Sequence, residues 1–85
     1  MTSSNQIRSR VARVVGRELR ANLTEHDLGS VMRLDELIAV DSIGLVKFAL
    51  GLEDEFGISL ANESFDRDFL LDVARLTAYL ETQRK

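Results

Sequence analysis

Apolar residues recur at helical spacing in three parts of this chain, and this periodicity constrains the fold more than any other feature. The three runs cover residues 5–22, 42–56 and 69–82. No stretch alternates with the two-residue period of a strand, and the chain contains no proline that would interrupt a helix. The pattern therefore predicts an all-α fold with three long helices that each bury one face.

Two shorter segments complete the predicted fold. Residues 62–67 are expected to form a helix of one or two turns before the last long helix. The long segment between the first two helices begins with Thr24 and Asp27, whose spacing can cap a short turn. Its scattered apolar residues suggest a loop laid over the core, and loops of this length usually serve a function. We expect one domain over residues 1–85, a small four-helix bundle with a long loop between helices one and two.

The composition excludes several kinds of active site. The chain has no cysteine and a single histidine, His26, so disulfides, thiolate zinc sites and most acid–base schemes lack their residues. A chain of 85 residues buries only about 60–65% of its unfolded surface, which disfavours a deep catalytic cleft. Neither a signal peptide nor a run of about 18 apolar residues that would span a membrane is found. We expect a non-catalytic, cytoplasmic protein.

Charge is sorted along the chain. Residues 1–23 contain five arginines and one glutamate, whereas residues 24–68 contain eleven acidic and three basic residues. The acidic middle disfavours nucleic acid as a target, because phosphate binding needs a positive face, and it favours a basic protein partner. A small helical nucleic-acid binder is the alternative that the arginines leave open, although they spread around most of the first helix instead of forming one face.

The second long helix has the densest apolar pattern. Its expected buried face is formed by Leu45, Phe48, Ala49, Leu52 and Phe56, widened by Ile43, Val46 and Leu50. Its opposite face is expected to hold Gly44, Lys47, Gly51, Asp54 and Glu55. Gly57 provides the stop signal, because glycine adopts the left-handed conformation that ends helices. The two internal glycines each cost about 1 kcal/mol relative to alanine, which indicates either a close approach of another segment or a tolerant site.

Asp41 and Ser42 stand at the start of this second helix. The first turn of a helix has unpaired N–H groups and the positive end of the helix dipole, so a phosphate attached to Ser42 would be stabilised there. The simpler interpretation is that one of the two residues only caps the helix, which is worth about 1 kcal/mol. For Asp41, capping and a functional role are compatible.

The sequence resembles the acyl carrier protein family. The resemblance rests on a helix, a long loop, an Asp-Ser-Ile motif at residues 41–43 that opens the next helix, and a Glu-Asp-Glu-Phe-Gly-Ile ending at residues 53–58, and it extends from Ile7 to about Leu80. It implies that Ser42 is the attachment point of 4'-phosphopantetheine, transferred from coenzyme A by a separate phosphopantetheinyl transferase. The chain would then carry acyl or aminoacyl groups as thioesters on the thiol of this arm, which agrees with its lack of cysteine.

The resemblance also implies which residues partners contact. Asp41 is similar to the family's acidic contact for the transferase, and Ile43 and Val46 to an apolar spot, although both are equally compatible with the core. An acidic recognition strip would follow at Glu53, Asp54 and Glu55. The implied partners are an acyl or aminoacyl ligase, a ketosynthase or an acyltransferase of fatty acid, modified-lipid or secondary-metabolite biosynthesis. The chain is expected to act as a monomer.

Three residues depart from the family pattern. Val40 precedes Asp41, whereas in the fatty-acid members the turn before the site commonly ends in glycine. Gly44 and Lys47 occupy positions where fatty-acid carriers have acids, and Lys47 reverses the charge of a surface that partners would touch. We therefore expect a specialised carrier with dedicated partners, and Lys47 among their contacts. An alternative keeps the carrier fold without the arm, which makes the chain an adaptor that does not need Ser42.

Overall fold

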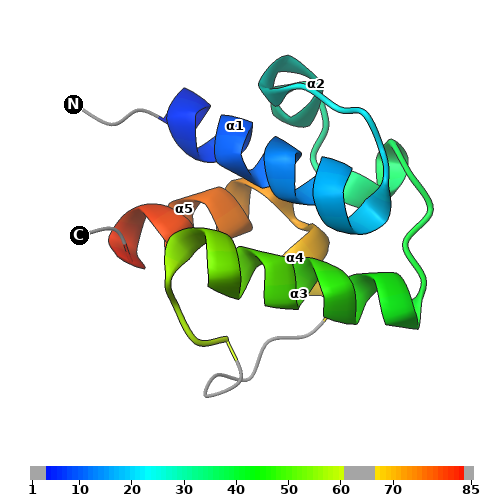
Figure 1. The fold of residues 1–85 in the computed structure, drawn as a ribbon. Helices are drawn as coiled ribbons and strands as arrows, with labels where there is room; N and C mark the ends of the chain where they lie inside the picture. Colours follow the sequence, from blue (N-terminus) through cyan, green and yellow to red (C-terminus); the bar gives the residue numbers. More distant parts are fainter. Residues whose placement is uncertain (1–3, 61–66, 84–85) are drawn as a thin grey trace.

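The computed structural model describes residues 4–60 and 67–83, and within these ranges the chain is mostly helical and has no strand, which confirms the predicted all-α class. The elements are α1 (Ser4–Val14), the π-helical turn η1 (Val15–Leu19), α2 (Glu25–Gly29), the 3-10 turn η2 (Leu34–Glu36), α3 (Ser42–Phe56), α4 (Arg67–Leu71) and α5 (Val73–Gln83). The start of α1 and the end of α5 lie on the same side of the molecule (Figure 1).

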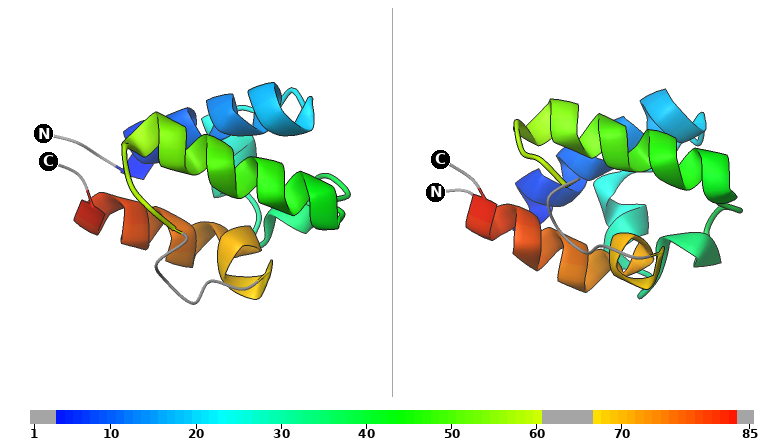
Figure 2. Two further views of the ribbon diagram at one scale, coloured as in Figure 1. Left: turned by 60° about the horizontal axis from the view of Figure 1, so that its bottom comes forward. Right: turned by 90° about the horizontal axis from the view of Figure 1, so that it is seen from below.

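Helix α1 contacts most of the other elements, because α2, α3 and α5 all pack against it. Helices α1 and α3 lie side by side and run in opposite directions, while α5 follows the other side of the core (Figure 2). The largest fully buried side chains come from six different elements; they are Ile7, Val14, Val15, Leu28, Phe48, Leu52, Leu71 and Leu80. One core therefore ties together the two halves of the chain.

The first helical segment is shorter than predicted. The sequence pattern predicts a helix over residues 5–22, but helical structure ends at Leu19. Arg20 follows in the left-handed conformation, with φ at 56° and ψ at 37°, and thereby takes the position that glycine usually occupies at a helix end. The pattern does not reveal this end because arginine favours helix interiors.

The segment between η1 and α3 lies over the core, as predicted. Thr24 and Asp27 form a capping box at the start of α2, in which the Asp27 N–H donates to Thr24 Oγ1 (3.1 Å) and the Thr24 N–H donates to Asp27 Oδ2 (2.9 Å). Farther along, Leu28, Leu34 and Val40 bury their side chains in the core. The predicted cap is confirmed, and the segment holds two short helical turns, α2 and η2.

The predicted helix over residues 69–82 is divided at Asp72 into α4 and α5. The N–H of Val73 donates to the carbonyl of Met32 (3.0 Å), so the chain of the α2–η2 segment takes one of the backbone donors at this corner. The Asp72 carboxylate then accepts the N–H of Arg75 (3.0 Å), which is how a capping residue starts a new helix. A contact between residues distant in sequence therefore accompanies the division of a segment that local periodicity predicts to be one helix.

The predicted short helix over residues 62–67 lies outside the described residues, apart from Arg67. Arg67 is the first residue of α4, and most of this five-residue helix falls where the pattern places the start of the last long helix. The described part of the chain thus contains a short helix between α3 and α5, closer to the C-terminus than expected.

Candidate functional site

The start of α3 is fixed by Asp41. Its backbone is extended, with φ at −88° and ψ at −178°, and its side chain accepts the N–H of Gly44 at 2.7 Å. Its carbonyl accepts the N–H of Leu45 at 2.8 Å, and the preceding Val40 is buried in the core. Asp41 is therefore the N-cap residue of a 15-residue helix whose far end is closed by Gly57 in the left-handed conformation (φ 65°).

Ser42 is the first residue of α3 and is exposed. Helix geometry leaves the N–H groups of Ser42 and Ile43 without intrahelical acceptors, and the helix dipole adds positive potential at this end. The hydroxyl thus combines access from solvent with an environment that tolerates an attached anion. The prediction placed Ser42 at a helix start, and the helix begins at that residue.

A shallow depression of about 340 Å³ lies beside this helix start, between η1 and α3. Arg20 and Lys47 contribute positive charges to its lining, and Glu18 and Asp41 contribute negative ones. Glu18 is paired with Arg17, with 3.1 Å between Oε2 and Nε, and the Asp41 carboxylate accepts the Gly44 N–H. The surface next to Ser42 is therefore mixed in charge and not an acidic face.

The two apolar residues expected to contact partners are on the solvent side of α3. Ile43 is 69% exposed and Val46 is 58% exposed. The pattern assigns both residues, and Leu50, to a widened core face; Leu50 is also 58% exposed, so this assignment is wrong for all three. The spacing of the three residues brings them onto one face of the helix. Phe48 and Leu52 are buried on a different face of the helix. The spacing of Leu50 relative to Ile43 and Val46 is the signal that would have identified it as an exposed residue of the same face as those two.

Most of the predicted acidic strip is engaged within the fold. A Glu53 carboxylate oxygen accepts the N–H of Leu60 at 2.6 Å, and Glu55, only 15% exposed, is bound by Arg10 with 3.0 Å between Nε and Oε2. Arg17 adds a second, longer ion pair to Glu55 at 3.8 Å. Of the three predicted acids, Asp54 is the exposed one.

The internal glycines of α3 face α1 and η1, and their predicted place on the solvent side is wrong. A Cβ on Gly51 would lie 2.6 Å from Cγ of Glu18 and 2.8 Å from Cγ1 of Val14, and one on Gly44 would lie 3.2 Å from Cδ2 of Leu19. The close approach that the sequence suggested as one explanation for these glycines is therefore found. Because of this close approach, α3 packs against α1 and η1 with its glycine face, and its face with Ile43, Val46 and Leu50 is exposed.

Among the described residues, three of the five arginines of residues 1–23 form ion pairs; they are Arg8, Arg10 and Arg17. Arg10 and Arg17 bind Glu55, and Arg8 lies 3.9 Å from a carboxylate oxygen of Glu25. The Arg10 guanidinium also stacks 4.3 Å above the ring centre of Phe56. These contacts reduce the positive charge that the segment can offer to a polyanion.

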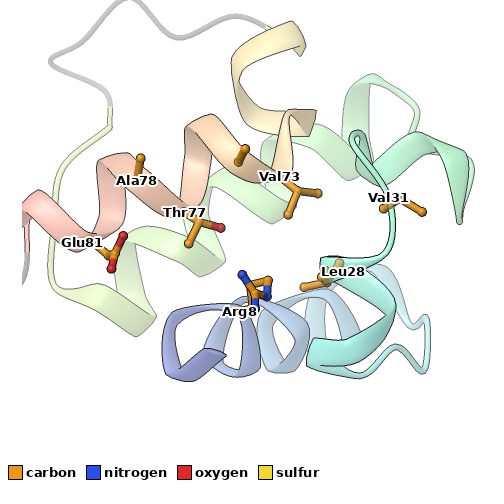
Figure 3. Close-up of a pocket in the computed structure, with 9 residues that line it drawn as sticks. Arg8, Leu28, Val31, Val73, Thr77, Ala78 and Glu81 are labelled. Carbon is orange, nitrogen blue, oxygen red and sulfur yellow. The ribbon is translucent and has the colours of Figure 1, made fainter. Parts of the chain in front are cut away.

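One enclosed apolar space in the interior is too small for a cargo. This space lies between α1, α3 and α5, with Leu28, Leu34 and Leu70 also in its lining, and has a volume of about 10 Å³, which is roughly the space of one water. A separate surface groove of about 300 Å³ opens between α1, α2 and α5 and is lined in part by Arg8, Thr77 and Glu81 (Figure 3). The groove contains no residue of α3, so it is distinct from the surface around Ser42.

A charged cluster holds the loop before α3 against α4. The Arg33 guanidinium donates to both carboxylate oxygens of Asp35 (3.0 and 3.1 Å) and to Asp68 (3.2 Å). These hydrogen bonds lower the pKa of the Asp35 carboxyl and raise the pKa of Arg33. The cluster therefore links residues that are 35 positions apart in the sequence.

Within residues 4–60 and 67–83, no group of three or more metal-ligating side chains is assembled, and no helix is both long and apolar enough to cross a membrane. Comparison of the chain with protein-family models, curated proteins and solved structures found no match. The function is therefore inferred from the geometry around Ser42.

Proposed function

We propose that this chain is a phosphopantetheine-dependent acyl carrier, with Ser42 as the attachment point of the arm. The observation that carries the proposal is an exposed serine hydroxyl at the first position of a long helix, directly after an aspartate that caps it. In the proposed fold, α1, α3 and α5 are the three long helices of a four-helix carrier bundle and α4 is the short one, while α2 lies in the loop.

The residues around Ser42 fit a phosphodiester. The serine Oγ is accessible to a transferase, the first-turn N–H groups stabilise negative charge, and Arg20 and Lys47 line the depression alongside. When bound, 4'-phosphopantetheine supplies the thiol that holds an acyl or aminoacyl group as a thioester. Asp41 keeps the helix start in place through its bond to Gly44, so the hydroxyl is presented from a rigid element.

The proposed role requires no catalysis by the chain itself. A phosphopantetheinyl transferase would load the arm from coenzyme A, and a ligase, ketosynthase or acyltransferase would add or use the cargo, in lipid or secondary-metabolite biosynthesis. Tethering raises the effective concentration of the cargo at such partners. The enclosed space lined by Val11, Phe48 and Leu76 has a volume of about 10 Å³, so it would admit an acyl chain only if the helices moved apart.

Intact mass spectrometry after incubation with coenzyme A and a broad-specificity phosphopantetheinyl transferase tests the proposal. We expect a gain of about 340 Da on the wild-type chain, localised to Ser42 by fragmentation, and no gain on Ser42→Ala. Ser9→Ala, which alters an exposed serine of α1, serves as the matched control and should be loaded like the wild type.

Absence of the mass gain, in a reaction in which a known carrier is fully loaded, would refute the carrier function. An adaptor that uses the same fold without the arm predicts that result. It also predicts that Ser42→Ala retains full function in the cell.

A further inference from the structure

The surface groove between α1, α2 and α5 has a volume of about 300 Å³ and contains no residue of α3 (Figure 3). Most of its wall is apolar; the lining residues of this kind are Leu28, Val31, Val73, Ala74 and Ala78. A groove of this size, with an apolar wall and a few polar groups, is typical of sites for small molecules. The function proposed for Ser42 does not use this groove.

Three polar side chains reach the groove from two helices. The Arg8 guanidinium extends from α1 toward Thr77 on α5, and Glu81 lies one turn farther along α5 (Figure 3). Thr77 is 6% exposed and is the one polar side chain that is buried within the described residues. Burial of a hydroxyl is costly unless it has a hydrogen-bond partner, and in this groove a ligand can provide one.

Arg8 is positioned by its neighbours in α2. Its Nε lies 3.9 Å from Oε2 of Glu25, which is a long ion pair, and its side chain is 24% exposed. The guanidinium lies close to Gly29, where a Cβ would be 3.3 Å from Nε and 3.6 Å from Cζ of Arg8. A side chain at position 29 would therefore crowd it. Because a guanidinium has several N–H donors, Arg8 can bind the carboxylate of a ligand in addition to its ion pair.

We propose that this groove binds a free α-amino acid with an aliphatic side chain. The carboxylate of the ligand accepts N–H groups of Arg8 and the hydroxyl of Thr77. The ammonium of the ligand pairs with Glu81. Its side chain packs against Val31 and Val73 at the apolar end of the groove.

The charges of the groove favour a zwitterion over an ion of one sign. Two carboxylates, those of Glu25 and Glu81, accompany the guanidinium of Arg8. A simple anion would bring a third carboxylate beside them, and a simple cation would place its charge next to Arg8, so each would meet repulsion. An α-amino acid has both charges on one carbon atom and can pair with Arg8 and Glu81 at once.

The test is an NMR titration of the isotope-labelled full chain with L-leucine, in which the Kd is taken from the saturation of backbone amide shifts. Three further probes each lack one part of leucine: isocaproate lacks the ammonium, isoamylamine lacks the carboxylate, and glycine lacks the side chain. The variants are Arg8→Gln, Thr77→Val and Glu81→Gln, with circular dichroism as a check that each is folded. Asp54→Asn removes one exposed carboxylate from α3 and is the matched control for Glu81→Gln.

We expect saturable shifts at Gly29 and Ala78, with a Kd for leucine in the millimolar range that is usual for so small a ligand in an open groove. Each of the three other probes should bind at least about tenfold more weakly, because a charged group or the apolar wall is left without its partner. Arg8→Gln and Thr77→Val should each raise the Kd for leucine about tenfold. Glu81→Gln, at an exposed position, should raise it several-fold, and Asp54→Asn should leave it unchanged.

The absence of saturable shifts at the groove would overturn the inference. Equal affinity for isocaproate or isoamylamine would overturn it as well, because the groove would then take a simple anion or cation. An unchanged Kd in Thr77→Val or Glu81→Gln would do the same, and these two variants decide the outcome if Arg8→Gln does not fold.

The titration is independent of the proposed function. It uses the chain without an arm and without a partner enzyme, so leucine can bind even if Ser42 is never loaded, and Ser42 can be loaded even if leucine does not bind. Failure of one proposal therefore leaves the other standing.

Discussion

The close approach of α1 to α3 at Gly51 gives the sharpest stability prediction. A Cβ at this position would lie 2.6 Å from Cγ of Glu18 and 2.8 Å from Cγ1 of Val14. The Glu18 side chain is 28% exposed and can turn away, but Val14 is fully buried and packed in the core. Because carbon atoms pack at about 3.5–4.0 Å, the two helices must separate by about half an ångström or more to admit an alanine.

Gly51→Ala therefore sets two effects against each other. Helix propensity favours alanine by about 1 kcal/mol, whereas overpacking of a core contact costs about 1–3 kcal/mol. The separation of α1 from α3 also loosens the packing around Val14, so we expect the cost to prevail and the free energy of unfolding to fall by about 1–2 kcal/mol. In a domain of this size, such a loss lowers Tm by about 4–16 °C.

Gly16→Ala is the matched control. Gly16 is exposed in η1, and the nearest atom to a Cβ there is the carbonyl oxygen of Ala21 at 3.7 Å, an ordinary contact. We expect this variant to be more stable than the wild type by about 0.5–1 kcal/mol. Thermal and urea unfolding followed by circular dichroism would compare the three proteins. Equal stabilisation by both alanines would refute the tight approach of α1 to α3.

Two further predictions concern carboxylates. Asp41→Ala removes the cap of α3 and should lower the free energy of unfolding by about 1 kcal/mol, while Asp41→Asn keeps an acceptor and most of the stability; equal losses in urea unfolding would contradict the capping role. Because Arg33 lowers the pKa of Asp35, this pair stabilises the fold above the ordinary Asp pKa of about 4, and the contribution is lost as the pH falls through the lowered pKa. In Arg33→Gln the Asp35 pKa measured by NMR should return toward its ordinary value, and an unchanged titration would show that Arg33 is not the cause.

Local signals were sufficient to predict the helix that presents the candidate site. Helix α3 runs from Ser42 to Phe56, as the sequence pattern predicts, because an aspartate before it and Gly57 after it fix both ends through neighbouring residues. The end of the first segment and the division of the last one were not predictable in this way. Arg20 turns left-handed, and the division at Asp72 accompanies a hydrogen bond from Val73 to Met32, which is distant in sequence.

The faces of α3 show a second limit of the pattern. Periodicity assigns apolar residues to the core, but glycine carries no such preference, and α1 and η1 pack where Gly44 and Gly51 provide room. As a result Leu50 is exposed, contrary to the pattern. The number of acidic residues available to partners was also overestimated. Glu55 binds Arg10, which is 45 residues earlier in the chain, and local sequence does not reveal such a contact.

The loop before α3 is bound to the α4–α5 corner, and these contacts determine where this chain can be joined to a related one in a chimera. Met32 accepts a hydrogen bond from Val73, and Arg33 binds Asp68, so the chain that leads to Ser42 is positioned by the C-terminal third. A chimera joined between α3 and α4 would inherit the serine and its helix from one parent and the support of that loop from another. Transfer of the Ser42 helix into another protein should therefore carry the α4–α5 part of the chain with it.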